Sequence, residues 1–425
     1  MPRVAICVCV VVVLGAAMAV GQRGGAFRES RDHPAIAYSS GPVHNPIAEL
    51  NGQIRDGEVH LDFEDQSGYL RSVLRALEIP IESQVAVFSQ TSFQAPMITS
   101  TNPRAIYFND STAAAWVRGG EVIELATHDR QQGAVFYVLQ QEPTEVPQFR
   151  RNDGCLSCHL SWETLGVPGF QVLSTAPLSP DPNDYATGFV TDHRSPLAER
   201  WGGWYVTGTV GPVFHMGNVE VTDVEEPSPP GTLPPAHSSL EEVTDLEGYL
   251  SSHSDVVALM VLNHQAHMAN LISRIGWEAR TVLFRPAAED TSFDELILES
   301  AAEVVDYMLF VDEAELAFPV SGSSGFAEQF ASVGPQDPEG RSLREFDLGE
   351  RLFRHPCSYM IYSEAFDALP DLAKDAVYQR MWEVLSGEET GEPYTRLSLV
   401  DRQAIVEILR ETKADLPAYF RSVTR

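Results

Sequence analysis

The chain has 425 residues, of which 44% are hydrophobic and 21% are charged. These fractions are close to globular averages and exclude collagen, coiled-coil and globally disordered classes, and the length predicts two to three domains. The 29 basic and 60 acidic side chains leave a net charge of −31. The arginines are scattered and the only lysines are Lys374 and Lys413, which excludes a nucleic-acid partner because such proteins cluster their basic residues.

Residues 1–19 have the pattern of a secretory signal peptide. Arg3 precedes an apolar run from Val4 to Leu14, and Ala17-Met18-Ala19 offers a small-residue cleavage site. An uncleaved anchor over 4–20 is the alternative, but that length is at the lower limit for spanning a bilayer. The sequence therefore predicts a periplasmic or extracellular protein with no stable membrane span after cleavage.

The first folded domain is predicted over residues 46–218, after a flexible lead-in at 20–45 that is rich in Gly, Ser and charge. Apolar residues three and four apart predict a helix from Tyr69 to Leu77, capped by Ser67. Short runs of β-branched and aromatic residues between turn formers then predict strands: Val85–Phe88, Ala105–Phe108, Glu121–Ala126, Ala134–Leu139 and Gly203–Gly208.

The second half of the chain has a helical pattern. Residues 219–255 carry nine carboxylates, five prolines and no Lys or Arg, which predicts a linker or a long surface loop. Residues 256–425 then show apolar stripes with few helix breakers, at Val256–Arg280, Phe293–Phe310, Leu372–Leu385 and Leu399–Leu409. The predicted fold class is α+β, with a mixed N-terminal half and a helical C-terminal half.

Cysteine usage carries the strongest chemical signal. Without the signal peptide only Cys155, Cys158 and Cys357 remain, which is too few for a disulfide framework. Cys155, Cys158 and His159 have the C-x-x-C-H spacing of c-type haem attachment. Two thiols at this spacing can reach the two vinyl groups of one porphyrin, and the following imidazole can bind the iron. A thioredoxin-like dithiol would need a βαβ context, and a zinc site would need more ligands than Cys357 supplies.

Residues 155–159 thus resemble the haem-binding motif of c-type cytochromes. The resemblance implies thioether bonds from Cys155 and Cys158, axial ligation by His159 and one covalent haem c per chain. The chain is much longer than a compact class I cytochrome c. Its Arg200–Tyr205 segment is similar to parts of larger exported bacterial haem proteins, and this second similarity implies no particular activity.

The sixth iron ligand decides between an electron carrier and a reactive or sensing haem. Met216 is one candidate, because it follows the motif by some tens of residues in a loop near a proline, and the neighbouring His215 is another. His264 and His267 are further candidates on one predicted helix, where His264 falls on the apolar seam. Ordinary packing of Met216 and a hydrogen-bonded core role for the two helix histidines are the alternatives.

We expect the protein to carry single electrons between exported partners. The acidic surface predicts a basic redox partner and association that slows as ionic strength rises. The alternative is a haem enzyme or gas sensor with an open distal face. A peroxidase-like version would use His128-Asp129-Arg130, although that segment is also typical of a polar turn between two strands.

Overall fold

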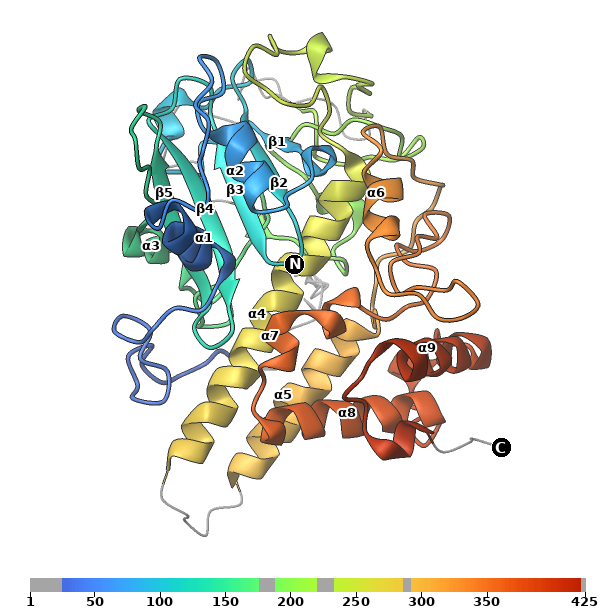
Figure 1. Cartoon of the computed structure of the whole chain (residues 1–425). Helices are drawn as coiled ribbons and strands as arrows, with labels where there is room; N and C mark the ends of the chain where they lie inside the picture. Colours follow the sequence, from blue (N-terminus) through green and yellow to red (C-terminus); the bar gives the residue numbers. More distant parts are fainter. Residues whose placement is uncertain (1–24, 176–187, 220–232, 286–291, 422–425) are drawn as a thin grey trace, which may run out of the picture.

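The computed structural model describes residues 25–175, 188–219, 233–285 and 292–421. It confirms the α+β class, with an antiparallel sheet from the N-terminal half and the long helices from the C-terminal half (Figure 1). Within those ranges no helix is long and apolar enough to cross a membrane. The predicted signal peptide lies outside the described residues.

The main sheet has the strand order β1-β2-β3-β4-β5-β6, and each strand is antiparallel to the next. Its strands are β1 Val85–Val87, β2 Arg104–Phe108, β3 Thr112–Trp116, β4 Val122–Asp129, β5 Gly133–Gln140 and β6 Arg150–Arg151; a second small sheet pairs β7 Leu173–Ser174 with β8 Phe189–Val190. Four predicted strands are confirmed. Strand β3 was not predicted, because its three central alanines have low strand propensity and are held by pairing on both sides.

The predicted strand at Gly203–Gly208 is wrong. In the described part of the chain this segment makes only isolated bridges, from Trp204 to Val87 and from Thr207 to His237 and Asp255. Gly203 and Gly208 have φ values of 83° and 109°, which interrupt an extended backbone at both ends of the segment. The pattern of apolar residues does not indicate the backbone conformation of these two glycines, so it could not predict that the strand is interrupted.

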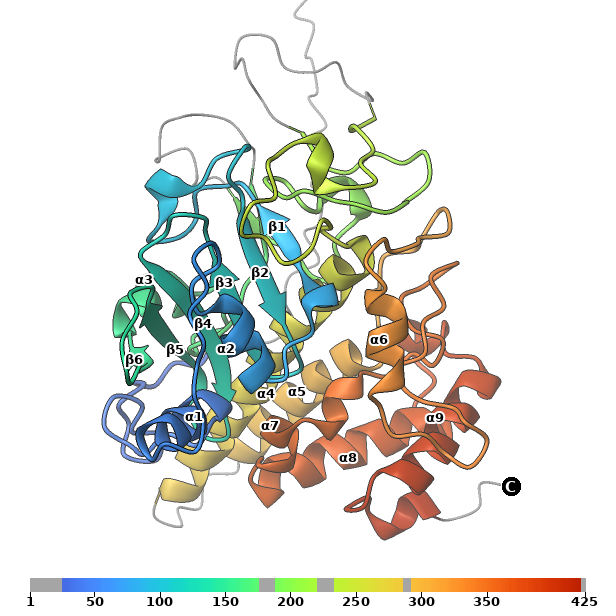
Figure 2. The ribbon, with the colours of Figure 1, turned by 45° about the horizontal axis from the view of Figure 1, so that its top comes forward.

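The sheet is covered on both faces. On one face, buried residues of β2 to β5 form a core cluster with α1 Pro46–Arg55 and α2 Leu70–Ala76. On the other face, Val85, Val87 and Phe108 pack in the cluster that contains the apolar side chains of α4 Val256–Phe284. Figures 1 and 2 show α4 running alongside the sheet. The sheet is therefore the middle layer of the N-terminal half.

Two N-terminal details differ from the sequence-based picture. Residues 25–45, the described part of the predicted lead-in, are irregular but packed, since Ile36 and Tyr38 are fully buried and Tyr38 Oη donates to Ala134 O at 2.9 Å. The cap predicted for α2 is wrong: Tyr69 precedes the helix with no side-chain cap, and Ser67 Oγ donates to Glu64 at 2.6 Å instead.

The four predicted C-terminal helices are confirmed, and α5 packs against both α4 and α8. The remaining helices are α3 Leu156–His159, α5 Ser292–Met308, α6 Phe326–Ser332, α7 Glu364–Asp367, α8 Asp371–Ser386 and α9 Leu399–Thr412. Short 3₁₀ turns lie at Ile81–Ser83, Ala95–Met97, Asp153–Cys155, Leu197–Glu199, Leu240–Glu242, Tyr359–Tyr362, Glu392–Tyr394 and Ala418–Arg421.

One hydrophobic core joins the two halves. The cluster that begins at Val85 in the sheet continues through α4, α5 and α8 to Phe420. It thus contains residues of both predicted domains, 46–218 and 256–425. Residues 233–255 of the predicted linker also pack, with Leu240 fully buried and Tyr249 nearly so.

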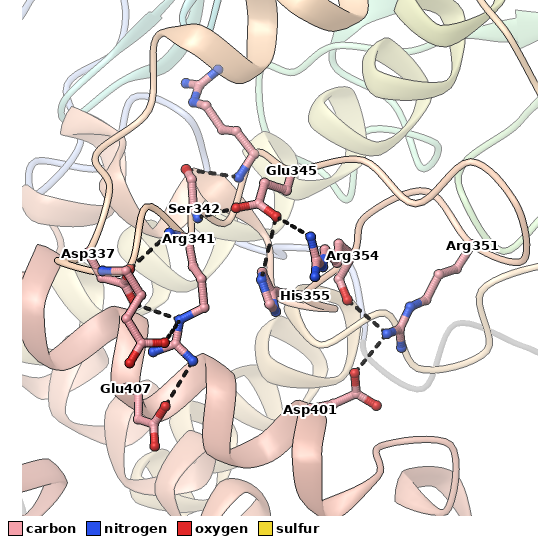
Figure 3. Close-up of polar contacts among 11 residues, drawn as sticks. Asp337, Arg341, Ser342, Glu345, Arg351, Arg354, His355, Asp401 and Glu407 are labelled. Atoms are coloured by element: carbon pink, nitrogen blue, oxygen red, sulfur yellow. Dashed lines mark hydrogen bonds and ion pairs between the residues drawn. The ribbon is translucent and has the colours of Figure 1, made fainter.

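The long loop between α6 and α7 is held by a network of arginine–carboxylate pairs (Figure 3). Arg341 contacts Asp337 at 2.7 Å and Glu407 of α9 at 2.9 Å. A further pair, Arg351–Asp401 at 2.7 Å, joins the loop to the first turn of α9. These contacts fix an irregular segment to the helical half of the molecule.

Candidate haem-attachment site

The C-x-x-C-H motif leaves the main sheet at its edge. Strand β6 pairs with β5, and directly after it Asn152 N donates to Phe136 O at 2.9 Å. The side chain of Asn152 then accepts from Gly154 N at 3.1 Å and starts the short turn that continues into α3. The two cysteines and His159 therefore share a compact turn fixed to the sheet. Figure 2 shows α3 next to β6 at this edge.

Both motif thiols are free, with Cys155 half-buried and Cys158 exposed. Burial raises the pKa of Cys155 to about 11, and the negative charge of Glu124 adds to this effect. A reactive dithiol needs the opposite shift, because the thiolate is the nucleophile. The surrounding sheet is also antiparallel, without the βαβ context of a thioredoxin-like pair. Both observations disfavour the redox dithiol alternative.

The imidazole of His159 is oriented by one hydrogen bond. Its Nδ1 lies 2.9 Å from Gly169 O, and since a carbonyl can only accept, Nδ1 carries the proton. Nε2 has no hydrogen-bond partner in the described part of the chain and is not among the fully buried unpaired atoms. Burial lowers the pKa of His159, which favours the neutral ring. A neutral imidazole with Nδ1–H on a carbonyl and Nε2 free is the form that binds metals.

The backbone around Gly169 completes this arrangement. Gly169 N donates to His159 O at 2.9 Å, so the two residues are joined in both directions. The preceding Pro168 O accepts from Ala134 N of β5 at 2.9 Å. The ring of Phe136, also on β5, lies 4.7 Å from the His159 ring. Strand β5 thus holds His159 in two ways: Phe136 packs against its ring, and Ala134 binds the segment that contains its hydrogen-bond partner, Gly169.

The surface beside the motif combines exposed aromatic rings with the ion pair of Arg104 and Glu124. Trp162 is 67% exposed and follows His159 by three residues, and Phe93 is 62% exposed. Phe93 borders the motif, because a Cβ placed on Gly154 would lie 3.6 Å from its ring. Arg104 pairs with Glu124 at 3.2 Å, near enough for both charges to act on the pKa of His159. Arg104 Nε is buried with no partner in the described structure.

The first two candidates for the sixth ligand lie in a separate loop. Met216 Sδ accepts from Ser174 Oγ at 3.6 Å, and Met216 N donates to Arg200 O. His215 is buried against Trp201, and burial lowers its pKa to about 4. Among described residues no hydrogen bond or ring contact joins either candidate to the motif. Ligation by Met216 or His215 stays a prediction.

His264 and His267 lie inside α4, where both are buried. His264 Nδ1 lies 2.8 Å from His193 Nδ1, and its Nε2 lies 2.7 Å from Ser358 Oγ. His267 Nε2 lies 3.2 Å from Arg194 Nη2. His264 would have to give up a hydrogen bond to bind iron, and ligation by either residue remains a prediction.

The residues of the peroxidase-like alternative face different parts of the molecule. Strand β4 ends at Asp129, and the chain turns before β5, as expected for a polar turn. His128 Nε2 lies 2.8 Å from Ser273 Oγ of α4, whereas exposed Arg130 pairs with Glu364 of α7 at 3.1 Å.

Sequence reasoning missed Gly169 and Asn270, the residues that support His159. Asn270 of α4 is 1% exposed and bonds the backbone of Phe170 through both atoms of its amide. A signal for it is present in the sequence: Asn263, His267, Asn270 and Arg274 are spaced four, three and four apart in a helix that is otherwise largely apolar. That spacing marks a buried polar face.

Among the described residues no group of three or more His, Cys, Asp or Glu side chains is placed to hold a metal ion. Cys357 is buried within the helical core. Comparisons with known proteins returned no match to a family model, a curated protein or a solved structure.

Proposed function

We propose that this protein is an exported c-type cytochrome that carries one covalent haem and transfers single electrons between partners in the periplasm or outside the cell. The observation that carries the proposal is the state of His159. It directly follows Cys158 of the two motif thiols, its Nδ1–H is held by Gly169, and its Nε2 has no hydrogen-bond partner among the described residues.

The residues present fit a haem at this place. Cys155 and Cys158 would form the thioether bonds, and His159 Nε2 would bind the iron, which supplies a one-electron redox couple. Trp162 and Phe93 offer apolar surface at the edge of the motif. Arg104, whose Nε has no partner in the described ranges, offers a donor for a carboxylate substituent of the porphyrin.

The test is expression of the full chain in a host competent for cytochrome c maturation, followed by mass spectrometry and optical spectra. We expect one haem bound through two thioethers and a Soret band. Cys155→Ser and Cys158→Ser should each leave a single thioether, and His159→Ala should lose the native spectrum. Cys357→Ser is the matched control and should retain haem. Apoprotein alone from a competent host would overturn the proposal.

Carbon monoxide distinguishes the electron carrier from the open-faced haem enzyme or gas sensor. A carrier with two protein ligands should show ferrous low-spin bands that carbon monoxide does not change. A shift on adding carbon monoxide would assign the second function instead. Replacing Met216, His215, His264 and His267 one at a time by Ala then identifies the sixth ligand as the variant that becomes sensitive to carbon monoxide.

The net charge suits a basic redox partner. Losing Arg3 with the signal peptide would leave 28 basic and 60 acidic residues, a net charge of −32. Attraction between opposite surfaces speeds encounter and is screened by salt. We therefore expect electron transfer to a small basic redox protein to slow as sodium chloride is raised from about 10 to 500 mM. A rate independent of salt would contradict this partner class.

A further inference from the structure

The segment that bonds His159 is held by Asn270 of α4, a helix that begins nearly a hundred residues further along the chain. Asn270 lies in the middle of α4, and its side-chain amide makes two hydrogen bonds to one residue. Oδ1 accepts from Phe170 N at 2.8 Å, and Nδ2 donates to Phe170 O at 2.7 Å. The amide thus satisfies both backbone polar groups of Phe170, which lies outside the strands that the structure describes.

These two hydrogen bonds from Asn270 to Phe170 form a clamp, and the clamp acts on Gly169, the hydrogen-bond partner of His159. Phe170 N belongs to the same peptide group as Gly169 O, which accepts the Nδ1–H of His159. Fixing that N–H therefore fixes the plane and direction of the carbonyl. On its other side the segment is held to β5 through Pro168 O, so it lies between the sheet and α4.

The close fit at Gly169 shows that the clamp leaves no spare room. A Cβ on Gly169 would lie 2.3 Å from Asn270 Oδ1 and 3.0 Å from Thr164 Cβ. Such distances exclude a side chain there unless the Asn270 amide is displaced from its place. Asn270 is almost completely buried, and a buried amide is tolerated only when it is hydrogen-bonded.

We propose that Asn270 is a positioning residue for the iron ligand: by fixing the Gly169 carbonyl it holds His159 as the Nδ1–H tautomer and keeps Nε2 directed for ligation. This inference rests on the proposed function for its effect on iron, but the tautomer is a property of the chain alone. A strong Nδ1–H hydrogen bond makes the imidazole a stronger electron donor and favours ferric iron. A weakened clamp should therefore raise the reduction potential.

The variants are Asn270→Ala, which removes both hydrogen bonds, and Asn270→Asp, which keeps the volume and the acceptor but loses the donor. Asn263→Ala is the matched control. Asn263 is a buried amide two turns earlier on the same helix, and it bonds Trp201 and Thr191 rather than the segment at Gly169. Its loss should destabilise the fold without reaching His159.

The first measurement is ¹⁵N NMR of the His159 ring in the apo chain, which does not depend on haem. We expect the Nδ1–H tautomer in the parent and in Asn263→Ala, a shift toward Nε2–H in Asn270→Ala, and a smaller shift in Asn270→Asp, which keeps the acceptor for Phe170 N. Folding is checked for each variant by circular dichroism. If Asn270→Ala does not fold, Asn270→Asp decides the outcome.

The second measurement is the reduction potential of the haem-loaded full chain. It should rise in Asn270→Ala and by a smaller amount in Asn270→Asp, and stay at the parent value in Asn263→Ala. A folded Asn270 variant with the parent tautomer, or an equal change in Asn263→Ala, would overturn the inference. Absence of haem in every chain would overturn the proposed function instead, while the tautomer would still test the clamp.

Discussion

The environment of individual buried groups determines how this chain responds to substitution and to pH. Gly169 illustrates packing, because no atom beyond hydrogen can occupy its Cβ position without touching Asn270. Glu313 illustrates charge, because its carboxylate is buried and accepts from Leu352 N at 2.8 Å. Each residue gives a prediction that does not depend on the proposed haem.

Gly169→Ala should destabilise the protein by about 1–3 kcal/mol, the usual cost of forcing extra atoms into a packed site. The built Cβ would lie 2.3 Å from Asn270 Oδ1, so the Asn270 amide must shift and its hydrogen bonds to Phe170 are strained. Urea unfolding measures the effect. Gly52→Ala is the control, because Gly52 lies in α1 with only Arg55 nearby, and there alanine should be neutral or stabilising. Equal effects at both sites would contradict the argument.

Glu313→Gln should stabilise the protein at neutral pH but not in acid. Burial raises the pKa of Glu313 from 4.5 to about 7. Since the folded-state pKa exceeds the unfolded value, stability from this group is fully present below about pH 4.5 and lost as the pH rises to about 7. Glutamine keeps the acceptor and removes the titration, so we expect a gain of about 1–3 kcal/mol above pH 7. The same gain at pH 4.5 would indicate packing rather than charge.

At the scale of elements, periodicity predicted what depends on local sequence. The apolar stripes of the long helices predicted them correctly: the helix predicted over 256–280 is α4 Val256–Phe284 in the structure. Strand β3 depends instead on two neighbours that hold an alanine-rich segment extended. The strand predicted at Gly203–Gly208 is wrong because the positive φ values of its two glycines interrupt the extended backbone that its aromatic and β-branched residues favour.

In the candidate site, too, some features depend on local sequence and others on contacts between distant residues. The spacing of Cys155, Cys158 and His159 is local and could be predicted from the sequence alone. The hydrogen bond to Gly169 spans ten residues, and the clamp joins residues 100 positions apart. No local sequence pattern predicts a contact between residues so far apart. The spacing of polar residues along α4 indicates only that its buried polar side chains need hydrogen-bond partners.

The start of α4 depends on a single carboxylate. Asp255 Oδ1 accepts from Val257 N and Ala258 N at 2.8 and 3.1 Å, and Oδ2 accepts from the backbone of Ser323 and Ser324 at 2.6 and 2.8 Å. The residue is fully buried. It therefore caps the helix and also holds the loop before α6.

Asp255→Ala should cost about 3–5 kcal/mol, because it removes the cap and leaves buried N–H groups without a partner. Ser398→Ala is the matched control, since Ser398 is an exposed N-cap of α9 and should cost only about 1 kcal/mol. Thermal or urea unfolding measures both. A loss at Asp255 no larger than that at Ser398 would show that the contacts to the α6 loop contribute little.

At the scale of the whole molecule, the sheet and the helices share one core. Because the cluster from Val85 to Phe420 is continuous, we expect the two halves to unfold in a single transition. The measurement compares near-ultraviolet circular dichroism with the far-ultraviolet helical signal across a urea titration. Coincident curves are expected in the parent. Two separated transitions would show that residues 46–218 and 256–425 are independent domains.

The position of Asn270 also bears on the order of events during synthesis. A chain that emerges from its N-terminus first presents both motif thiols about a hundred residues before the helix that steadies the neighbouring imidazole exists. For the proposed haem, both thioether bonds would then become possible before α4 exists. His159 would reach its final orientation only afterwards, once Asn270 can bond Phe170.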